Sequence, residues 1–352
     1  MRAAVYYGAR DVRVEDRPAP SPDEGEVLLQ VLRSGVCGTD ATEWSSGPKT
    51  FPITTRHPVT AHNGPMILGH EFIGRVVEPA DGGRFEAGTL VASGAGVSCG
   101  TCRRCRQGRT NLCERYYTLG LNTAGGMAEL VAVPETVLVD VPPSMSVDRA
   151  GLAQPMAVGL HAARRSGVRP GDRVVLIGAG AIGSFVLAGL RSLADADIAV
   201  IDFPGSRLQR AQRLGATRTI EAGPDVVARV RESFGGSGAD VVVEASGAPG
   251  QLDTATELVR PGGTILQVGL PSEPQQVDVH SLVMREVSVL TTLAHVCGDD
   301  LAAALAILDS STLADEVLES VHPLEDLPTQ LELLATGRLD GKVLFDPALV
   351  PG

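Results

Sequence analysis

The chain has 352 residues, of which 43% are hydrophobic and 20% are charged, so it is long enough for two domains with buried cores. This composition excludes an intrinsically disordered chain and a small module held together by disulfides. The formal net charge of −12 disfavours binding to nucleic acid or to an anionic membrane surface, so we expect small-molecule partners.

The sequence carries no targeting signal that we can identify. Residues 1–17 are interrupted by charges and lack the apolar core of a signal peptide, so we expect a cytoplasmic protein. Residues 174–190 are uncharged, but their four glycines favour a buried strand, turn and helix over a membrane span. Because disulfides are rare in the cytoplasm, we expect the six cysteines to be metal ligands or free thiols.

The N-terminal part of the chain is predicted to be a β-rich domain that spans residues 1–157. It contains short alternating runs, such as 26–32 and 127–133, which are separated by glycine and proline turns. Apolar residues at helical spacing over 148–167 predict a helix that bridges to the next domain.

Residues 158–293 are predicted to form a second domain in which strands alternate with helices. This alternation indicates a parallel sheet covered on both faces. Residues 294–352 are too few for a domain of their own and are expected to return to the N-terminal one, ending in a strand at 341–345. The strands predicted in the second domain are 173–177, 198–202, 240–244, 264–269 and 287–293.

A glycine-rich turn between a predicted strand and a predicted helix indicates a dinucleotide site. The pattern is Gly-x-Gly-x-x-Gly, in which glycines permit a tight turn and let the backbone approach a pyrophosphate at the helix N-terminus. Asp202 ends the next predicted strand and is expected to accept hydrogen bonds from ribose hydroxyls. Because its carboxylate would repel a 2′-phosphate, NAD is predicted over NADP. The predicted phosphate-binding residues are Gly178, Gly180, Ala181, Ile182 and Gly183.

Further residues near the carboxyl ends of predicted strands extend this cofactor site. Arg207 follows Asp202 by five residues and would either stack on the adenine or weaken the discrimination against NADP, unless it is a solvated helix residue. The nicotinamide half is expected to lie beside Gly247, Val268, Gly269 and Leu270.

Four closely spaced cysteines predict a metal site. They are Cys99, Cys102, Cys105 and Cys113. Four thiolates complete the tetrahedral shell of a zinc ion and leave no open position, so this zinc would be structural. Three cysteines at this spacing also suit an iron–sulfur cluster, which a colourless purified protein would exclude.

A second group of metal-ligand types combines Cys37 with His70 and Glu71. On spacing alone, a cysteine and a histidine so far apart are usually core residues. A nicotinamide site in the same chain changes this interpretation, because hydride loss from an alcohol requires its hydroxyl to be deprotonated. A zinc ion with an open position lowers the pKa of a bound alcohol.

On these residues the chain resembles the zinc-containing medium-chain alcohol and polyol dehydrogenases over essentially its whole length. Within that family it is most similar to the branch of sorbitol, butanediol, threonine and sugar dehydrogenases. The segments that carry the resemblance are 37–40, 69–74, 99–113, 125–129, 178–183 and 244–247.

The resemblance implies an α/β protein with a GroES-like β-rich catalytic domain and a Rossmann domain, which holds a doubly wound parallel sheet. It also implies an active site in the cleft between the domains and a homodimer or homotetramer. Cys37, His70 and, as an additional oxygen ligand, Glu71 would bind the catalytic zinc. Thr39 would hydrogen-bond the substrate alkoxide and start proton transfer to solvent.

Two positions depart from the family pattern. Gln154 stands where many relatives have a glutamate that can approach the zinc, so the metal would be more electropositive here. Gln154 would then be a weak ligand or an outer hydrogen-bond donor, unless it bonds only to the backbone. Thr42 stands where many members have a histidine that passes the proton outward, and a hydroxyl cannot buffer near neutral pH.

We therefore predict a zinc-dependent oxidoreductase that transfers hydride between a secondary alcohol and NAD, giving a ketone. Six of the 21 residues in 45–65 are Ser or Thr, which favours a polyol, sugar, cyclitol or vicinal diol as the substrate. Trp44 either walls the substrate pocket or belongs to the core. The alternatives are an amino-alcohol dehydrogenase of the threonine type, a metal-independent quinone or enone reductase, and a non-catalytic NAD-binding relative.

Overall fold

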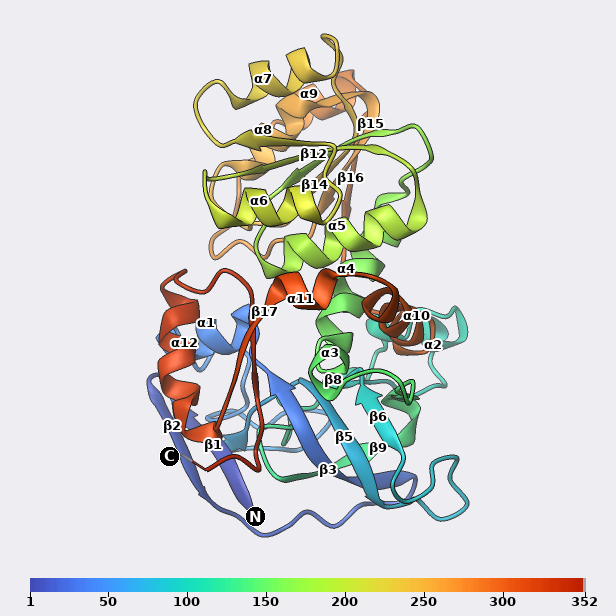
Figure 1. Cartoon of the computed structure of the whole chain (residues 1–352), viewed down its shortest axis with the longest axis vertical. Helices are drawn as coiled ribbons and strands as arrows, with labels where there is room; N and C mark the ends of the chain where they lie inside the picture. Colours follow the sequence, from blue (N-terminus) through green and yellow to red (C-terminus); the bar gives the residue numbers. More distant parts are fainter. Residues whose placement is uncertain (351–352) are drawn as a thin grey trace. The chain divides into compact units, whose positions relative to one another are not determined.

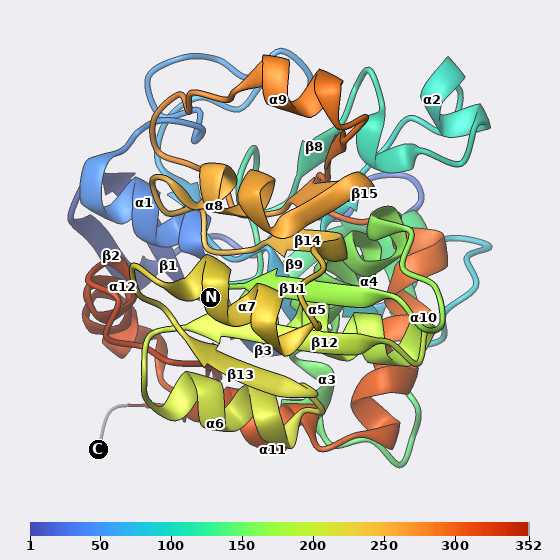
Figure 2. The same cartoon turned by 90° about the horizontal axis from the view of Figure 1, so that it is seen from above.

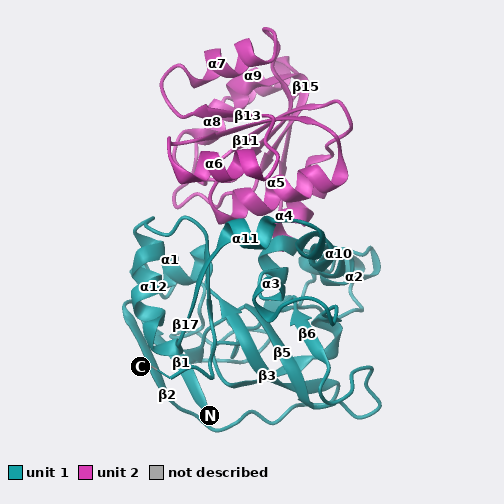
Figure 3. Cartoon of the chain, viewed as in Figure 1, with its two compact units in different colours: residues 1–157, 295–352 teal, residues 158–294 magenta. Residues whose placement is uncertain are grey.

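The computed structural model describes residues 1–350 and divides the chain into two compact units (Figures 1 and 3). Unit 1 contains residues 1–157 and 295–352, and unit 2 contains residues 158–294. Figure 3 shows the C-terminal segment in the same unit as the N-terminal strands. Within the described residues, every helix is too short or too polar to span a bilayer.

Unit 1 is built on a mainly antiparallel seven-stranded sheet. The strand order is β10-β6-β5-β3-β18-β17, and β9 also pairs with β3. Only β17 and β18 run parallel to each other, so the C-terminal segment adds the last two strands to a sheet that the N-terminal segment begins. The strands are β3 (Glu26–Gly35), β5 (Glu71–Glu78), β6 (Leu90–Ser93), β9 (Leu130–Pro134), β10 (Leu138–Asp140), β17 (Leu318–His322) and β18 (Lys342–Phe345).

Two smaller sheets complete the β-structure of unit 1. One has the order β2-β1-β4, and the other pairs β7 with β8. Strand β1 buries Ala3, Ala4, Val5 and Tyr6 in succession, which indicates contact with the core on both of its faces. The strands are β1 (Arg2–Gly8), β2 (Asp11–Asp16), β4 (Met66–Ile67), β7 (Gly96–Val97) and β8 (Tyr117–Thr118).

The first helix of unit 1, α1, packs against the C-terminal segment. Trp44 on α1 shares a core cluster with Leu327 and Leu331 on α12 and with Val343 and Phe345 on β18, so the C-terminal segment packs directly on the first helix. The helices are α1 (Gly38–Ser46), α2 (Arg103–Arg106), α3 (Val147–Ala150), α10 (Cys297–Ser310), α11 (Leu313–Val317) and α12 (Leu327–Ala335), and α4 (Ala153–Ser166) continues into unit 2.

Unit 2 contains a six-stranded, entirely parallel sheet in the order β13-β12-β11-β14-β15-β16. Figure 2 shows β14, β11, β12 and β13 side by side. The chain starts at β11 and builds outward first to one side and then to the other, so the strand order reverses between β11 and β14. The strands are β11 (Arg173–Ile177), β12 (Asp197–Asp202), β13 (Arg218–Glu221), β14 (Ala239–Glu244), β15 (Val259–Gln267) and β16 (Ser288–Thr291).

Helices cover both faces of this parallel sheet. One core cluster joins alternate strand residues to α4, α5 and α6, and the other joins the remaining strand residues to α7, α8 and α9. Each strand is therefore apolar on both sides, as a doubly wound sheet requires. The helices are α5 (Ala181–Leu193), α6 (Ser206–Arg213), α7 (Val226–Ser233), α8 (Gln251–Leu258) and α9 (Val279–Met284).

This topology confirms the predicted fold class, and it differs from the prediction in two elements. Strand β13 was not expected from the sequence, because only Ile220 of its four residues is buried. The single bridging helix predicted over 148–167 is divided into α3 and α4, which are separated by a turn at Gly151 and Leu152.

Candidate active site and metal centres

Cys37 lies between β3 and α1, where it caps the N-terminus of the helix. Its N–H donates to Oδ2 of Asp40 at 2.9 Å, and the backbone of Asp40 donates to the side chain of Cys37 in return. This reciprocal pair is a capping box, in which the side chains satisfy N–H groups that the helix cannot. The local sequence Cys-Gly-Thr-Asp therefore fixes the thiol at the N-terminus of α1.

His70 and Glu71 stand at the start of β5, and glycines determine how the chain reaches them. Gly69 has φ +97°, a conformation that favours glycine. A Cβ atom at Gly120 or Gly125 would lie only 2.3 or 2.2 Å from the carbonyl oxygen of Gly69. Three backbone segments can meet here only because these residues lack side chains, and this packing sets the position of His70.

The structure brings the three predicted ligands together. Each of these residues, Cys37, His70 and Glu71, offers one ligand atom, and the three atoms all lie within 4.8 Å of one another. Nδ1 of His70 lies 3.7 Å from Oδ1 of the buried Asp40, so the other ring nitrogen is the one left for a metal. Glu71, which is 1% exposed, forms an ion pair with Lys342 of β18, which is 5% exposed.

The electrostatics of this cluster favour a cation. Burial alone would lower the pKa of His70, but the negative charges of Asp40, Cys37 and Glu71 raise it to about 9. Burial raises the pKa of Asp40, and the charge of His70 opposes this shift. Acidic groups therefore lie close together at a site where burial disfavours their charged forms.

The donor set fits a zinc ion. Thiolate, imidazole and carboxylate are the usual protein ligands of zinc, with bonds of about 2.0–2.3 Å, and the donor atoms are close enough to converge on one ion after small movements. Within residues 1–350, His70 Nδ1 and Asp40 Oδ1 are buried without a hydrogen-bond partner. Such groups are costly, and a cation bound to the imidazole would strengthen its attraction to the carboxylate.

The other predicted catalytic residues lie near the ends of helices. Thr39 is half-buried on the first turn of α1, two residues after Cys37. Gln154 is buried at the start of α4. Thr42 is exposed, and its hydroxyl donates to the carbonyl of Gly38 at 2.9 Å, a bond that holds it along the helix. The roles of Thr39 and Gln154 stay predictions.

The four cysteines between positions 99 and 113 also converge, with their sulfur atoms within 4.8 Å of one another. Backbone N–H groups point at them: that of Cys99 lies 3.2 Å from the sulfur of Cys113, and that of Cys102 lies 3.3 Å from the sulfur of Cys99. A hydrogen bond from Thr101 lowers the pKa of Cys99 to about 6, whereas burial raises that of Cys105 to about 11. Such N–H donors stabilise thiolates, so the loop fits a four-sulfur metal site.

The glycine turn of unit 2 is shaped for a ligand at the N-terminus of α5. A Cβ at Gly183 would lie 2.0 Å from the carbonyl oxygen of Gly178, so the helix starts very close to the end of β11. The N–H of Ala179 donates to Oδ2 of Asp202 at 2.6 Å, and its carbonyl accepts from the buried Arg210 at 2.9 Å. Asp202 and Arg210 therefore hold the turn from both sides.

The residues predicted to border the nicotinamide half belong to two adjoining loops. A Cβ at Gly269 would lie 2.1 Å from the nitrogen of Gly247, and a Cβ at Gly247 would lie 2.9 Å from the carbonyl oxygen of Leu270. The N–H of Val268 donates to the carbonyl of Glu244. Arg207 is half-buried on the first turn of α6.

Comparison with known proteins adds the family to this geometry. Residues 23–143 match the family described as alcohol dehydrogenase GroES-like domain, and residues 181–310 match zinc-binding dehydrogenase. The chain is 31% identical to (R,R)-butanediol dehydrogenase of Bacillus subtilis (strain 168) over 331 residues, which cover 93% of this chain and 94% of that protein. The chain belongs to the zinc-containing medium-chain alcohol dehydrogenases. It is therefore an oxidoreductase of the alcohol dehydrogenase class.

Other members of the family agree with this assignment. The chain is 32% identical to sorbitol dehydrogenase of Bacillus subtilis (strain 168) over 276 residues, which cover 78% of this chain and 76% of that protein. The crystal structure of 2R,3R-butanediol dehydrogenase from Bacillus subtilis is similar with a TM-score of 0.89 and 29% identity, covering 98% of this chain and 99% of that chain. The GroES-like domain and the Rossmann-like domain are thus both confirmed.

In this dehydrogenase, Trp44 belongs to the core rather than to a pocket wall. It is 7% exposed, packs against α12, and donates from Nε1 to Oε2 of Glu332 at 2.9 Å. Of the two interpretations that the sequence left open, the structure supports the core position.

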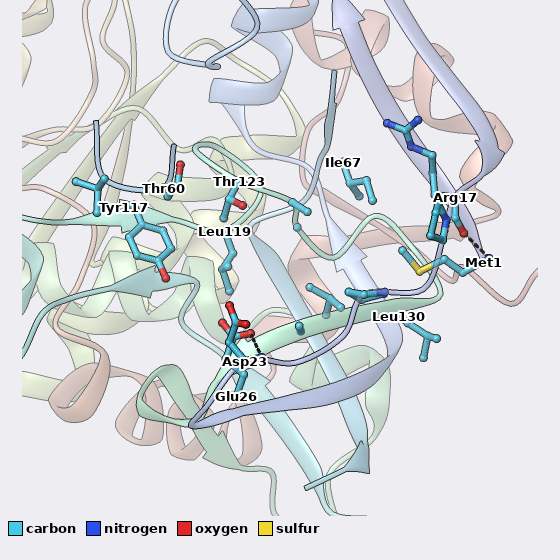
Figure 4. Close-up of a pocket in the computed structure, with 17 residues that line it drawn as sticks. Met1, Arg17, Asp23, Glu26, Thr60, Ile67, Tyr117, Leu119, Thr123 and Leu130 are labelled. Atoms are coloured by element: carbon cyan, nitrogen blue, oxygen red, sulfur yellow. Dashed lines mark hydrogen bonds between the residues drawn. The ribbon is translucent and has the colours of Figure 1, made fainter. Parts of the chain in front are cut away.

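A pocket of about 580 Å³ lies in unit 1 (Figure 4). Thr60, from the polar segment 45–65, lines it, whereas Cys37, His70 and Glu71 do not. Figure 4 shows Arg17 beside Met1 on the right, Asp23 and Glu26 together in the lower middle, and Thr60 and Tyr117 on the left. The labelled lining residues are Met1, Arg17, Asp23, Glu26, Thr60, Ile67, Tyr117, Leu119, Thr123 and Leu130.

The sequence analysis assigned no role to three residues that contact the candidate sites. Asp40 faces His70, Lys342 pairs with Glu71, and Arg210 holds the cofactor turn. Only Asp40 had a local signal, because an acid three residues after a helix cap is typical of a capping box.

Proposed function

We propose that this dehydrogenase reversibly oxidises a secondary alcohol group of a polyol, sugar, cyclitol or vicinal diol to a ketone, with NAD as the hydride acceptor. The observation that carries the proposal is the convergence of Cys37, His70 and Glu71 in a chain that also has a nucleotide-binding turn. The polar segment 45–65 and the similarity to sorbitol and butanediol dehydrogenases favour a hydroxyl-rich substrate.

Each residue of the cluster would have a defined task. Cys37, His70 and Glu71 would hold a catalytic zinc, which supplies a Lewis acid that lowers the pKa of an alcohol. Asp40 would keep the imidazole of His70 oriented by attracting its Nδ1–H. Thr39 would hydrogen-bond the substrate oxygen and pass its proton toward solvent, with Gln154 as a neutral neighbour of the metal.

A preference for NAD over NADP rests on Asp202. Its two carboxylate oxygens accept the N–H groups of Ala179 at 2.6 Å and Phe203 at 2.7 Å, so the carboxylate is held in place at the end of β12. An ionised group in this position repels a 2′-phosphate and leaves lone pairs for ribose hydroxyls. Steady-state kinetics with both cofactors tests this preference, and a higher kcat/KM with NADP would contradict it.

A metal count and a substrate panel test the whole proposal. The parent protein should contain two zinc ions per chain, and both the Cys37→Ala and the Cys113→Ala variants should lose one. Only Cys37→Ala should abolish NADH formation while the fold persists. Full activity of Cys37→Ala would favour a metal-independent quinone or enone reductase, and visible absorption of the parent would indicate an iron–sulfur cluster at the four cysteines.

An amino-alcohol substrate is the second candidate. The chain is 27% identical over 338 residues to L-threonine 3-dehydrogenase of Idiomarina loihiensis, covering 94% of this chain and 95% of that protein. A panel that contains L-threonine, sorbitol, xylitol and butanediol separates the two classes by kcat/KM.

We also propose a cytoplasmic homodimer or homotetramer. All six cysteines are free, which suits a reducing compartment. Strand β16 is the last strand of its sheet, and apolar side chains are exposed on it, just after it and on α9. An edge strand with exposed apolar side chains is typical of protein interfaces. Size-exclusion chromatography with light scattering tests this, and a monomer at micromolar concentration would contradict it. The exposed apolar residues are Val279, Val283, Met284, Val289 and Leu293.

A further inference from the structure

We propose that Glu244 is a positioning residue for the nicotinamide half of the cofactor. It would act through two loops, residues 245–247 after β14 and residues 268–270 after β15. The inference rests on the proposed NAD site, and it assigns a task to a buried acid that the proposed chemistry does not use.

Glu244 is the last residue of β14, and its side chain is 0% exposed. One carboxylate oxygen accepts the N–H of Ser246 at 2.7 Å and also accepts the Ser246 hydroxyl. The other accepts the N–H of Gly247 at 3.0 Å and Nε2 of Gln267 at 2.5 Å. These donors are uncharged, so directed hydrogen bonds hold the buried carboxylate in place.

The same residue also holds the second loop. The main-chain carbonyl of Glu244 accepts the N–H groups of Val268 at 2.8 Å and Gly269 at 2.9 Å. Nε2 of Gln267 donates both to Glu244 and to the carbonyl of Gly269 at 2.7 Å. Glu244 is therefore the common acceptor for both loops.

The two loops touch each other and the phosphate-binding turn. A Cβ at Gly269 would lie 2.1 Å from the nitrogen of Gly247 and 2.7 Å from Oε2 of Glu244. A Cβ at Gly178, the first glycine of the turn, would lie 3.0 Å from the nitrogen of Ser246. A shift of the Glu244 carboxylate would therefore be transmitted to both loops, which have no room to absorb it. The turn itself is held separately by hydrogen bonds to Asp202 and Arg210.

The sheet order indicates which half of the cofactor these loops serve. A dinucleotide binds across the carboxyl edge of such a sheet at the point where the strand order reverses, which is between β11 and β14 here. Asp202, at the end of β12, marks the adenosine side. The loops after β14 and β15 lie on the opposite side of the reversal, where the nicotinamide half would bind.

The test compares NADH with ADP-ribose, which lacks the nicotinamide. Glu244→Gln keeps the shape of the side chain, but it removes the charge and places an N–H₂ group against existing donors. We expect the Kd of NADH, measured by isothermal titration calorimetry of the purified full chain, to rise about 10- to 100-fold. The Kd of ADP-ribose should change by less than about threefold, because Asp202 and the glycine turn are untouched.

Glu221→Gln is the matched control, because Glu221 also ends a strand of this sheet but is exposed. It should leave both Kd values unchanged. Ser246→Ala removes one hydroxyl donor and should weaken NADH binding selectively but less than Glu244→Gln. Equal weakening of NADH and ADP-ribose by Glu244→Gln, or weakening of neither, would overturn the role of Glu244.

Two further outcomes keep the test decisive. If Glu244→Gln does not fold, Ser246→Ala and Gln267→Met replace it, and an unchanged ratio of the two Kd values in both overturns the inference. If the parent protein binds neither NADH nor ADP-ribose, the proposed NAD site itself is wrong, which is a different failure.

Discussion

Lys342 is the buried cation next to the candidate catalytic metal site, and its removal gives a sharp prediction. Its ammonium forms an ion pair with Glu71 and donates a hydrogen bond to the carbonyl of Val36. Removal of one partner of a buried ion pair costs about 3–5 kcal/mol, because the other charge stays buried without compensation. We therefore expect Lys342→Met to lower the free energy of unfolding of the metal-stripped protein by about 3–5 kcal/mol.

A double-mutant cycle separates the ion pair from the loss of packing. Glu71→Gln alone leaves the lysine charge buried and should cost a similar amount. The double variant Glu71→Gln/Lys342→Met removes both charges, so its cost should be smaller than the sum of the single costs by at least about 2 kcal/mol.

Urea denaturation at pH 7 in the presence of a chelator measures these costs. Trp44, the one tryptophan of the chain, reports on the correct unit by fluorescence, because it shares a core cluster with Val343 next to Lys342. Lys49→Met is the control: Lys49 is the other lysine of the chain and is exposed, so its removal should change stability by less than about 0.5 kcal/mol. Additive single costs, or equal effects of the two lysine variants, would refute the reasoning.

Three more predictions follow from contacts near the metal sites and from one buried thiol. Gly125→Ala would place a Cβ 2.2 Å from the carbonyl oxygen of Gly69, which precedes His70. This variant should lower the melting temperature and the zinc content of the purified protein. Gly298→Ala is the control and should do neither, because a Cβ there meets no atom within 4 Å. Asp40→Asn removes the charge that faces His70 and should weaken zinc binding about 10- to 100-fold in a chelator competition; an unchanged affinity would show that the 3.7 Å contact has no effect. Burial raises the pKa of Cys297 to about 12, so iodoacetamide at pH 8 should label this thiol only after unfolding. Mass spectrometry measures the label, and labelled Cys297 in the native protein would contradict this prediction.

The parts of the site that are written in contiguous sequence could be predicted. The turn needs glycine at Gly178 because φ is +95° there, and at Gly183 because a Cβ would lie 2.0 Å from a carbonyl oxygen. Four cysteines within one loop need no distant partner to converge. In each case the physical requirement acts over a few residues, so it leaves a pattern in the chain.

Contacts between distant segments left no such pattern. Trp44 follows a metal-ligand motif, which favoured a place beside the substrate, but its partner Glu332 lies 288 positions further along. The segment that holds β13 has one buried apolar side chain, Ile220, and β13 becomes a strand only because it pairs along the edge of β12. Neither outcome can be read from neighbouring residues.

The C-terminal segment adds two strands to the sheet of unit 1, and it also balances the charge of the candidate catalytic cluster. When ionised, Cys37, Asp40 and Glu71 carry three negative charges, of which those of Asp40 and Glu71 are buried, and Lys342 supplies one positive charge. A divalent cation brings the total to zero, whereas without Lys342 the loaded site would keep a net negative charge that burial makes costly. Strand β18 thus completes the electrostatics of a site whose ligands all come from the first 71 residues, so truncation before β18 would disable metal binding as well as the fold of unit 1.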